Sequence, residues 1–86
     1  MARRHLDCYP HIVRNPRVLG GEPTIAGTRI PVWVVVAARR MQQDVPAILR
    51  AYPALTAALV EEALAFADAH PREIETALAE NEVELA

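Results

Sequence analysis

Apolar side chains recur at helical spacing along most of the chain after Pro31. The first segment, residues 32–42, places Trp33, Val36 and Ala37 on one face. Its run of three valines also suits a β-strand, because β-branched side chains lose rotamer freedom in a helix. The segment is longer than a typical strand and ends in good helix formers, and proline is tolerated in a first helical turn. The pattern therefore favours a helix.

Three further helices are expected, at residues 45–51, 57–69 and 72–82. Asp44 and Thr56 stand immediately before the first two, and their side-chain oxygens suit the N-cap position, where they accept a hydrogen bond from the first turn. The helix at 57–69 has an apolar stripe and an acidic outer face, as surface helices do. Its stripe is predicted to consist of Leu55, Leu59, Ala63, Phe66 and Ala67.

The chain before Pro31 has a different pattern, with short β-branched pieces between glycines and prolines. His11–Arg14 is a strand candidate, and Pro23–Ile25 and Thr28–Ile30 are two short extended pieces around Gly27, which can adopt a positive φ. An isolated two-stranded ribbon is marginal in water. We therefore expect these pieces to pair with His11–Arg14 or with a second copy of the chain.

The 86-residue chain has the composition of one small globular domain, with 52% apolar and 23% charged residues. No apolar run approaches the roughly 20 residues that a membrane helix needs, so we expect a cytoplasmic protein without membrane contacts. The single cysteine, Cys8, cannot form an internal disulfide. We expect a flexible arm at residues 1–10, one domain at residues 11–82 and a tail at residues 83–86.

Charge is divided unevenly along the chain. Residues 1–50 hold eight arginines and three acidic residues, whereas residues 51–86 hold one arginine and eight acidic residues. A basic half suits phosphate or an acidic partner, and an acidic half repels both. A solvated helix face together with a compositional preference for arginine over lysine explains the same numbers, so both interpretations stay open.

Four blocks of sequence stand out along the chain. The longest is Gly20–Val32, with the sequence GGEPTIAGTRIPV. The others are AYPALT at residues 51–56, EALAFA at 62–67 and HPREI at 70–74. Together they make residues 11–82 resemble, block by block and in the same order, the family called domain of unknown function 433. That family consists of predicted antitoxins of bacterial and archaeal toxin–antitoxin pairs.

The resemblance implies a fold that is mainly α with a short N-terminal β segment, in which a homeodomain-like three-helix core with a helix-turn-helix is followed by a C-terminal helix. The helix lengths predicted above fit such a unit, with the turn between residues 51 and 57. The resemblance also implies a homodimer and a cognate toxin, commonly PIN-like, that the protein neutralises. The motif residues expected to build the dimer ribbon are Gly21, Pro23, Ile25, Gly27, Thr28, Arg29, Ile30 and Pro31.

Binding of the protein's own operator DNA would depend on arginines, because each phosphate contact requires a cation. In a helix-turn-helix the second helix enters the major groove. Here that helix carries Glu61, Glu62 and Asp68 and no cation, so it is a poor candidate for reading DNA. The DNA-binding candidates are instead Arg3, Arg4, Arg14, Arg17, Arg39, Arg40 and Arg50.

The acidic, amphipathic C-terminal region is the candidate surface for the toxin, because such a helix can lie in a groove of a basic partner. The alternative is a terminal helix packed on its own domain. The candidate toxin contacts are Glu73, Ile74, Leu78, Glu80 and Val83.

No enzyme activity, cofactor, metal or small-molecule substrate is expected. The chain has no serine, and His5, Cys8 and His11 supply too few ligands for a structural zinc site, which needs four. The glycines of Gly20–Val32 are not followed by the Gly-Lys-Ser/Thr of a nucleotide-binding loop. Arg29 has two interpretations, as a contact to a phosphate or a partner's carboxylate, or as an ion pair with Glu22 that locks the β segment.

The predicted function is therefore an antitoxin that neutralises its toxin and binds operator DNA as a dimer. The alternatives are a stand-alone DNA-binding transcriptional regulator and a structural dimerisation module.

Overall fold

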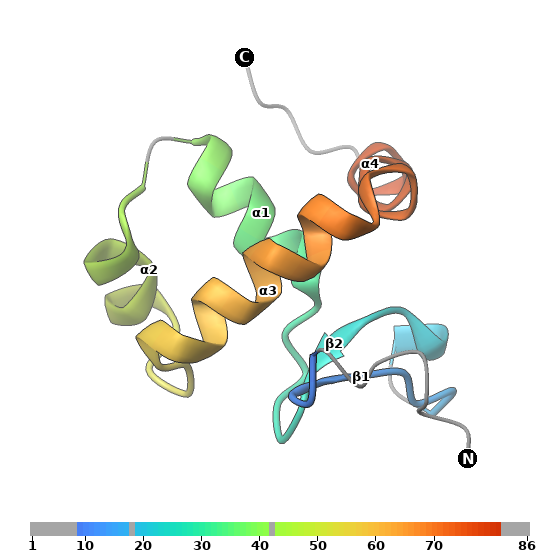
Figure 1. The fold of residues 1–86 in the computed structure, drawn as a ribbon, viewed down its shortest axis with the longest axis horizontal. Coiled ribbons are helices and arrows are strands. Elements are labelled where there is room, and N and C mark those ends of the chain that lie inside the picture. The colour runs from blue at the N-terminus through green and yellow to red at the C-terminus, as the bar shows by residue number, and fades with distance from the viewer. Residues whose placement is uncertain (1–8, 18, 42, 82–86) are drawn as a thin grey trace.

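Four helices and a two-stranded antiparallel ribbon make up the part of the chain that the structure describes (Figure 1). This computed structural model describes residues 9–17, 19–41 and 43–81. In chain order the elements are β1 (Ile12–Val13), the 3-10 turn η2 (Leu19–Gly21), β2 (Thr24–Ile25), α1 (Val32–Arg40), α2 (Val45–Ala51), α3 (Ala57–Ala69) and α4 (Pro71–Glu80). The predicted mainly helical fold with a short N-terminal β segment is confirmed.

Local capping chemistry sets where α2 and α3 begin. The Asp44 carboxylate accepts a hydrogen bond from the backbone N–H of Ala47 at 2.9 Å, and the Thr56 hydroxyl accepts one from Leu59 at 3.2 Å. These bonds satisfy donors that have no partner inside a first helical turn. Both predicted N-caps are therefore confirmed, and α2 and α3 have the predicted bounds.

The ribbon joins β1 to β2 in antiparallel register, with Ile12 opposite Ile25 and Val13 opposite Thr24. The backbone N–H of Ala26 also donates to the carbonyl of His11 at 2.8 Å. The expected pairing of Pro23–Ile25 with His11–Arg14 is thus confirmed within one chain. Figure 1 shows the ribbon near the start of α1 and below α3.

The second extended piece, expected at Thr28–Ile30, is shifted along the chain: Thr28 and Arg29 form a tight bend, and the antiparallel contact with β2 is an isolated bridge between Thr24 and Pro31. Gly27 adopts φ +78°, which lets the chain reverse, and the N–H of Ile25 then donates to the carbonyl of Ile30 at 3.0 Å. The Thr28 hydroxyl closes the bend, since it donates to the carbonyl of Ile25 at 2.7 Å and accepts from the N–H of Ile30 at 3.0 Å.

The core forms where α3 packs across α1. The fully buried face of α3 contains Val60, Ala63 and Phe66, whereas Leu59, predicted in the stripe, is only half-buried. On α1 the inward side chains are Val32, Val35, Val36, Ala37 and Ala38. Trp33, predicted on the inward face, is half-buried at the edge. The other members of the predicted α3 stripe, Leu55, Ala63, Phe66 and Ala67, are buried as expected. Val60 takes the inward position expected of Leu59, because the crossing of the two helices, which periodicity does not specify, decides which positions face inward.

An aromatic cluster seals the junction between the ribbon and the helices. The Phe66 ring is fully buried, stacks on His70 at 4.3 Å between centroids and meets the edge of Tyr9 at 5.4 Å. Such aromatic pairs add about 0.5–1.5 kcal/mol to the contribution of buried area. Tyr9, predicted as part of a flexible arm at residues 1–10, is therefore packed against the core, whereas residues 1–8 lie outside the described part of the chain.

The helices α2 and α3, joined by the turn at Tyr52–Leu55, have the chain order of a helix-turn-helix, and α1 crosses α3 (Figure 1). At the opposite end of α3 the chain turns at His70 into α4, which packs on α1 next to the ribbon. None of the helices in residues 9–17, 19–41 and 43–81 is long and apolar enough to cross a membrane.

Candidate functional site

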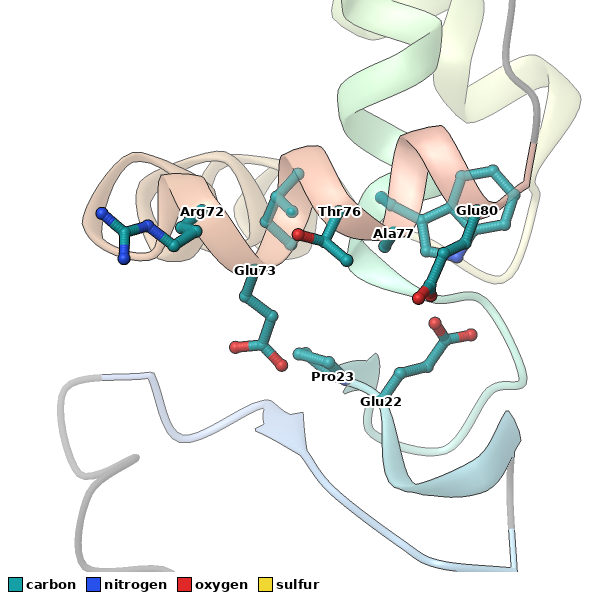
Figure 2. A pocket seen from close by; sticks show the side chains of 9 residues that line it. Glu22, Pro23, Arg72, Glu73, Thr76, Ala77 and Glu80 are labelled. Carbon is teal, nitrogen blue, oxygen red and sulfur yellow. The ribbon is translucent and has the colours of Figure 1, made fainter.

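A groove of about 480 Å³ lies between α4 and the loop that leads into β2. Most of its α4 lining comes from Glu73, Thr76, Ala77 and Glu80, which are not among the buried core positions of that helix. The lining is mainly apolar, with acidic side chains at its edge (Figure 2). The remaining lining residues are Glu22, Pro23, Trp33, Arg72 and Ile74.

The amphipathic pattern of α4 creates this wall. Ile74 and Leu78, four residues apart, are buried in the core and fix the rotation of the helix about its axis. That rotation turns Glu73, Ala77 and Glu80 toward the ribbon side. The helix ends at Asn81, whose side-chain amide donates to the carbonyl of Ala77 at 2.7 Å.

The opposite wall is held by short hydrogen bonds around Thr24. Its hydroxyl donates to the carbonyl of Glu22 at 2.8 Å, which fixes the backbone of the loop. The N–H of Val32, at the start of α1, donates to the carbonyl of Pro23 at 3.0 Å and ties the same loop to the helices. Gly21, at φ +89°, supplies the left-handed turn that precedes Glu22. The loop is thus a defined surface.

One of the three acidic side chains in the lining is already engaged. Glu73 accepts two hydrogen bonds from the guanidinium of Arg14, at 2.6 and 2.9 Å. These bonds raise the pKa of Arg14 above its ordinary value, with burial acting in the opposite direction. Because the pair links the chain after β1 to α4, it holds the ribbon against the helix that forms the groove.

The other two acidic side chains, Glu22 and Glu80, have no hydrogen bond or ion pair with any described residue. They come from segments 58 positions apart, and Figure 2 shows their carboxylates pointing toward one another across the groove. The one cation in the lining, Arg72, extends away from both at the other end of α4 (Figure 2). This end of the groove is therefore an acidic edge around an apolar floor.

Trp33 lines this groove and also lines a second one. That second groove, of about 350 Å³, lies between α1 and α2, is mainly apolar and includes Val34, Ala37, Met41 and Tyr52. Met41 is the exposed large hydrophobic side chain of the described chain, at 55% exposure. The indole N–H of Trp33 is buried without an acceptor among the described residues, so apolar contacts hold the ring in place. The two grooves share the indole as a common wall.

The predicted toxin contacts fall into three groups. Glu73 and Glu80 line the groove, as the acidic surface prediction requires. Ile74 and Leu78 are 3% and 4% exposed and belong to the core, so in the folded domain they offer a partner almost no surface, although Ile74 also reaches the lining of the groove. Their burial follows the amphipathicity that suggested them, because the same apolar face packs on its own domain. Val83 lies outside the described residues.

The predicted DNA contacts are dispersed. Arg14 is paired with Glu73, and Arg40, at the end of α1, is paired with Glu75 of α4. Arg39 donates to the carbonyl of Gln43 at 2.9 Å. Arg17 and Arg50 are exposed, and Arg3 and Arg4 lie outside the described part of the chain.

Arg29 does not pair with Glu22, which corrects the second of the two interpretations of this residue. It is exposed in the bend at residues 26–29 and forms no ion pair within the described chain, while Glu22 turns into the groove. Hydrogen bonds of Thr28, given above, lock the bend in its place. Among the remaining motif residues, Pro23, Ile25 and Pro31 are buried and support the ribbon within one chain.

His11, one of the three residues considered for a metal, is bound by Glu62 of α3. The Glu62 carboxylate accepts from the backbone N–H of His11 at 2.7 Å and lies 2.9 Å from its Nδ1. No group of three or more potential ligands occurs among residues 9–17, 19–41 and 43–81. His5 and Cys8 lie outside these ranges.

Sequence reasoning missed Glu22 and Trp33 as site residues. The signal available for them was weak, because Glu22 is the single acid of the block Gly20–Val32 and Trp33 is the chain's single tryptophan. Neither observation indicates that these residues lie across a groove from α4.

The chain is similar to a known protein family, to a solved structure and to a curated protein. Residues 12–67 match the family described as "Protein of unknown function (DUF433)". The crystal structure of a DUF433 member protein from Anabaena variabilis aligns with a TM-score of 0.77 and 33% sequence identity, covering 91% of this chain and 78% of that one. The "Uncharacterized protein y4eO" of Sinorhizobium fredii is 37% identical over 60 residues, which are 70% of this chain and 27% of that protein. The chain thus spans about a quarter of the length of this curated relative.

Proposed function

The chain belongs to the DUF433 family, and from that premise we propose that it acts as an antitoxin, which binds and neutralises a basic toxin protein through the groove beside α4. The observation that carries this proposal is the pair of carboxylates, Glu22 and Glu80, at the edge of an apolar groove and without a cationic partner in the described chain. An apolar floor with a polar rim is the usual anatomy of a protein-binding surface. Complementary charge speeds and orients the encounter of two such proteins.

A toxin that cleaves RNA needs a basic surface to hold the phosphates, so an acidic face is a suitable complement. The resemblance to predicted antitoxins supports the same choice of partner. Because α4 is anchored by buried Ile74 and Leu78, the proposed contact surface is preformed, which limits the entropy lost on binding. The proposal includes a cytoplasmic location, where toxin and antitoxin are made together.

Operator binding as a dimer is the second part of the proposal, and it is assigned to arginines outside α3. The exposed residues of α3 include Glu61 and Asp68, and this helix has no cation to meet a phosphate. Arg17, Arg39 and Arg50 are exposed and free of ion pairs within the described chain, so they are available for phosphates.

Co-expression tests the neutralisation. A small gene adjacent to the one for this chain is expressed alone and together with the chain, and growth is recorded. We expect the neighbour's product to arrest growth alone, and the chain to restore growth and co-purify with that product. A neighbour that remains toxic in the presence of folded, soluble chain contradicts the proposal.

DNA binding is measured separately, as the shift of the upstream DNA over a range of salt concentrations. The variant Arg39→Gln/Arg50→Gln is expected to lose binding and retain neutralisation, since neither arginine contributes to an intramolecular ion pair or to the groove beside α4. Affinity for DNA should fall with salt, because arginine–phosphate contacts release counterions. The variant Glu61→Gln tests whether α3 faces the DNA. Removing this carboxylate would raise the affinity for DNA if α3 lay against the phosphates, and we expect no change.

A further inference from the structure

We propose that the groove beside α4 receives an arginine side chain of the partner protein, with its guanidinium between Glu22 and Glu80 and its stem on the apolar floor. This inference rests on the proposed function and specifies the partner's chemistry at the site. The two carboxylates come from different elements and turn toward the same space (Figure 2). An inserted cation would bond both and remove the repulsion between them.

The shape of the site favours arginine over lysine. A guanidinium presents five donors in a planar fork and can bond two carboxylates at once, whereas an ammonium is a compact point charge. The arginine stem is aliphatic and lies well along apolar surface, here that of Pro23 and Ala77. Trp33 also lines the groove, and an indole ring attracts a guanidinium that reaches its face through cation–π contact.

The size of the groove indicates more than a single bound side chain. Its volume of about 480 Å³ is in the range of about 300–1,000 Å³ in which drug-sized molecules bind, so the arginine enters with part of its backbone. The adjoining groove of about 350 Å³ shares Trp33 and ends at exposed Met41. An apolar residue next to the arginine would occupy this second groove, which makes an arginine followed by an apolar residue the expected recognition element.

Trp33 provides the test, because it is the single tryptophan of the chain and lines both grooves. The full chain is titrated with the peptide acetyl-Gly-Leu-Arg-Ala-Leu-Gly-amide while tryptophan emission is recorded. Matched peptides carry lysine or glutamine in place of arginine. We expect a saturable change of emission with the arginine peptide, weaker binding of the lysine peptide and no saturation with the glutamine peptide. Equal binding of all three peptides, or saturation with none, overturns the proposal.

The variant Glu22→Gln/Glu80→Gln tests the two carboxylates. Glu80 is exposed, Glu22 is partly exposed, and neither carboxylate has a hydrogen bond with a described residue, so the fold should be retained, which far-UV circular dichroism and the thermal midpoint verify. We expect the arginine peptide to bind about tenfold more weakly or worse, because two charge-assisted hydrogen bonds are replaced by neutral ones. Glu61→Gln/Asp68→Asn, which also removes two negative charges, but from exposed positions of α3 outside the groove, is the matched control and should bind like the original chain. Unchanged affinity in the double variant contradicts the proposal.

The chain's own arginines at positions 3 and 4 are a competing source of the cation. If Arg3→Gln/Arg4→Gln alters the emission of Trp33 in the free protein and tightens peptide binding, the chain's own arm is the occupant and the partner proposal is wrong. We expect neither change.

The growth assay for neutralisation distinguishes the proposed arginine site from the proposed antitoxin function. A double variant Glu22→Gln/Glu80→Gln that restores growth as well as the original chain would overturn the arginine site and leave the antitoxin function standing. Peptide binding that depends on both carboxylates, in a chain that neutralises no neighbour, would support the arginine site and contradict the antitoxin function.

Discussion

Arg14 and Glu73 connect the ribbon to α4, and breaking this ion pair is expected to cost about 1 kcal/mol of folding free energy. The two hydrogen bonds, at 2.6 and 2.9 Å, have the bidentate geometry that strengthens such pairs. The side chains are 31% and 37% exposed, so water screens the attraction. Exposed pairs contribute about 0.2–1 kcal/mol, and the geometry here places the value near the upper limit.

A double-mutant cycle isolates the pair. Arg14 also lies 6.0 Å from the Phe66 ring centroid, and Glu73 has contacts beyond this pair, so single variants remove more than one interaction. The cycle uses Arg14→Met, which keeps an apolar stem, together with Glu73→Gln. Urea unfolding is followed by circular dichroism at low and high salt. Loss of the pair should lower the thermal midpoint by about 4–8 °C per kcal/mol in a domain of this size.

The expected coupling energy is about 1 kcal/mol at low salt and smaller at high salt, because ions screen exposed charges. Arg17→Met, which removes an exposed arginine with no ion pair in the described chain, is the control and should leave stability nearly unchanged. A coupling below about 0.3 kcal/mol, the range of independent sites, would refute the idea that this pair fastens the ribbon to α4.

The same unfolding assay checks four further predictions. Thr56→Ala should cost about 1 kcal/mol through loss of the α3 N-cap, with Thr56→Ser close to the original chain. Phe66→Ala should cost about 3–5 kcal/mol, because the ring is fully buried, and should blunt the cooperative transition. Gly27→Ala should cost about 1–2 kcal/mol, since φ is +78° there. Arg40 lowers the pKa of Glu75 through its hydrogen bonds, so the stability lost in Arg40→Gln should be seen above the ordinary pKa of 4.5 and vanish as pH falls through the lowered value.

Helix boundaries were predictable because their causes are local. Asp44 and Thr56 cap the helices that follow them, and each hydrogen bond spans three positions. The bend at Gly27 was equally local, although the sequence pattern suggested a strand after it. The difference arises because the Thr28 hydroxyl competes for the backbone of its neighbours, which favours a turn over a ladder.

The candidate site was less predictable because its members are distant in sequence. Glu22 and Glu80 meet only because the ribbon docks against α4, and Trp33 reaches the groove only because α1 crosses α3 with Val32, Val35 and Val36 inward. Helical periodicity identifies an apolar face but not the partner that covers it. For that reason Ile74 and Leu78 appeared equally suited to a foreign partner and to the core, and the structure assigns them to the core.

The structure shows that some of the unevenly distributed charges pair with one another inside the domain. Among the residues that the structure describes, three contacts join the basic half to the acidic half: His11 with Glu62, Arg14 with Glu73 and Arg40 with Glu75. Part of the charge division therefore serves folding, by holding the ribbon and α1 to the later helices. Substitution of these residues would change stability and binding together. The charges that can discriminate between partners are those without an ion pair among the described residues. They are the carboxylates of Glu22 and Glu80 at the groove and the exposed arginines Arg17, Arg39 and Arg50. A test of DNA or toxin binding is therefore decisive only when it alters these unpaired residues.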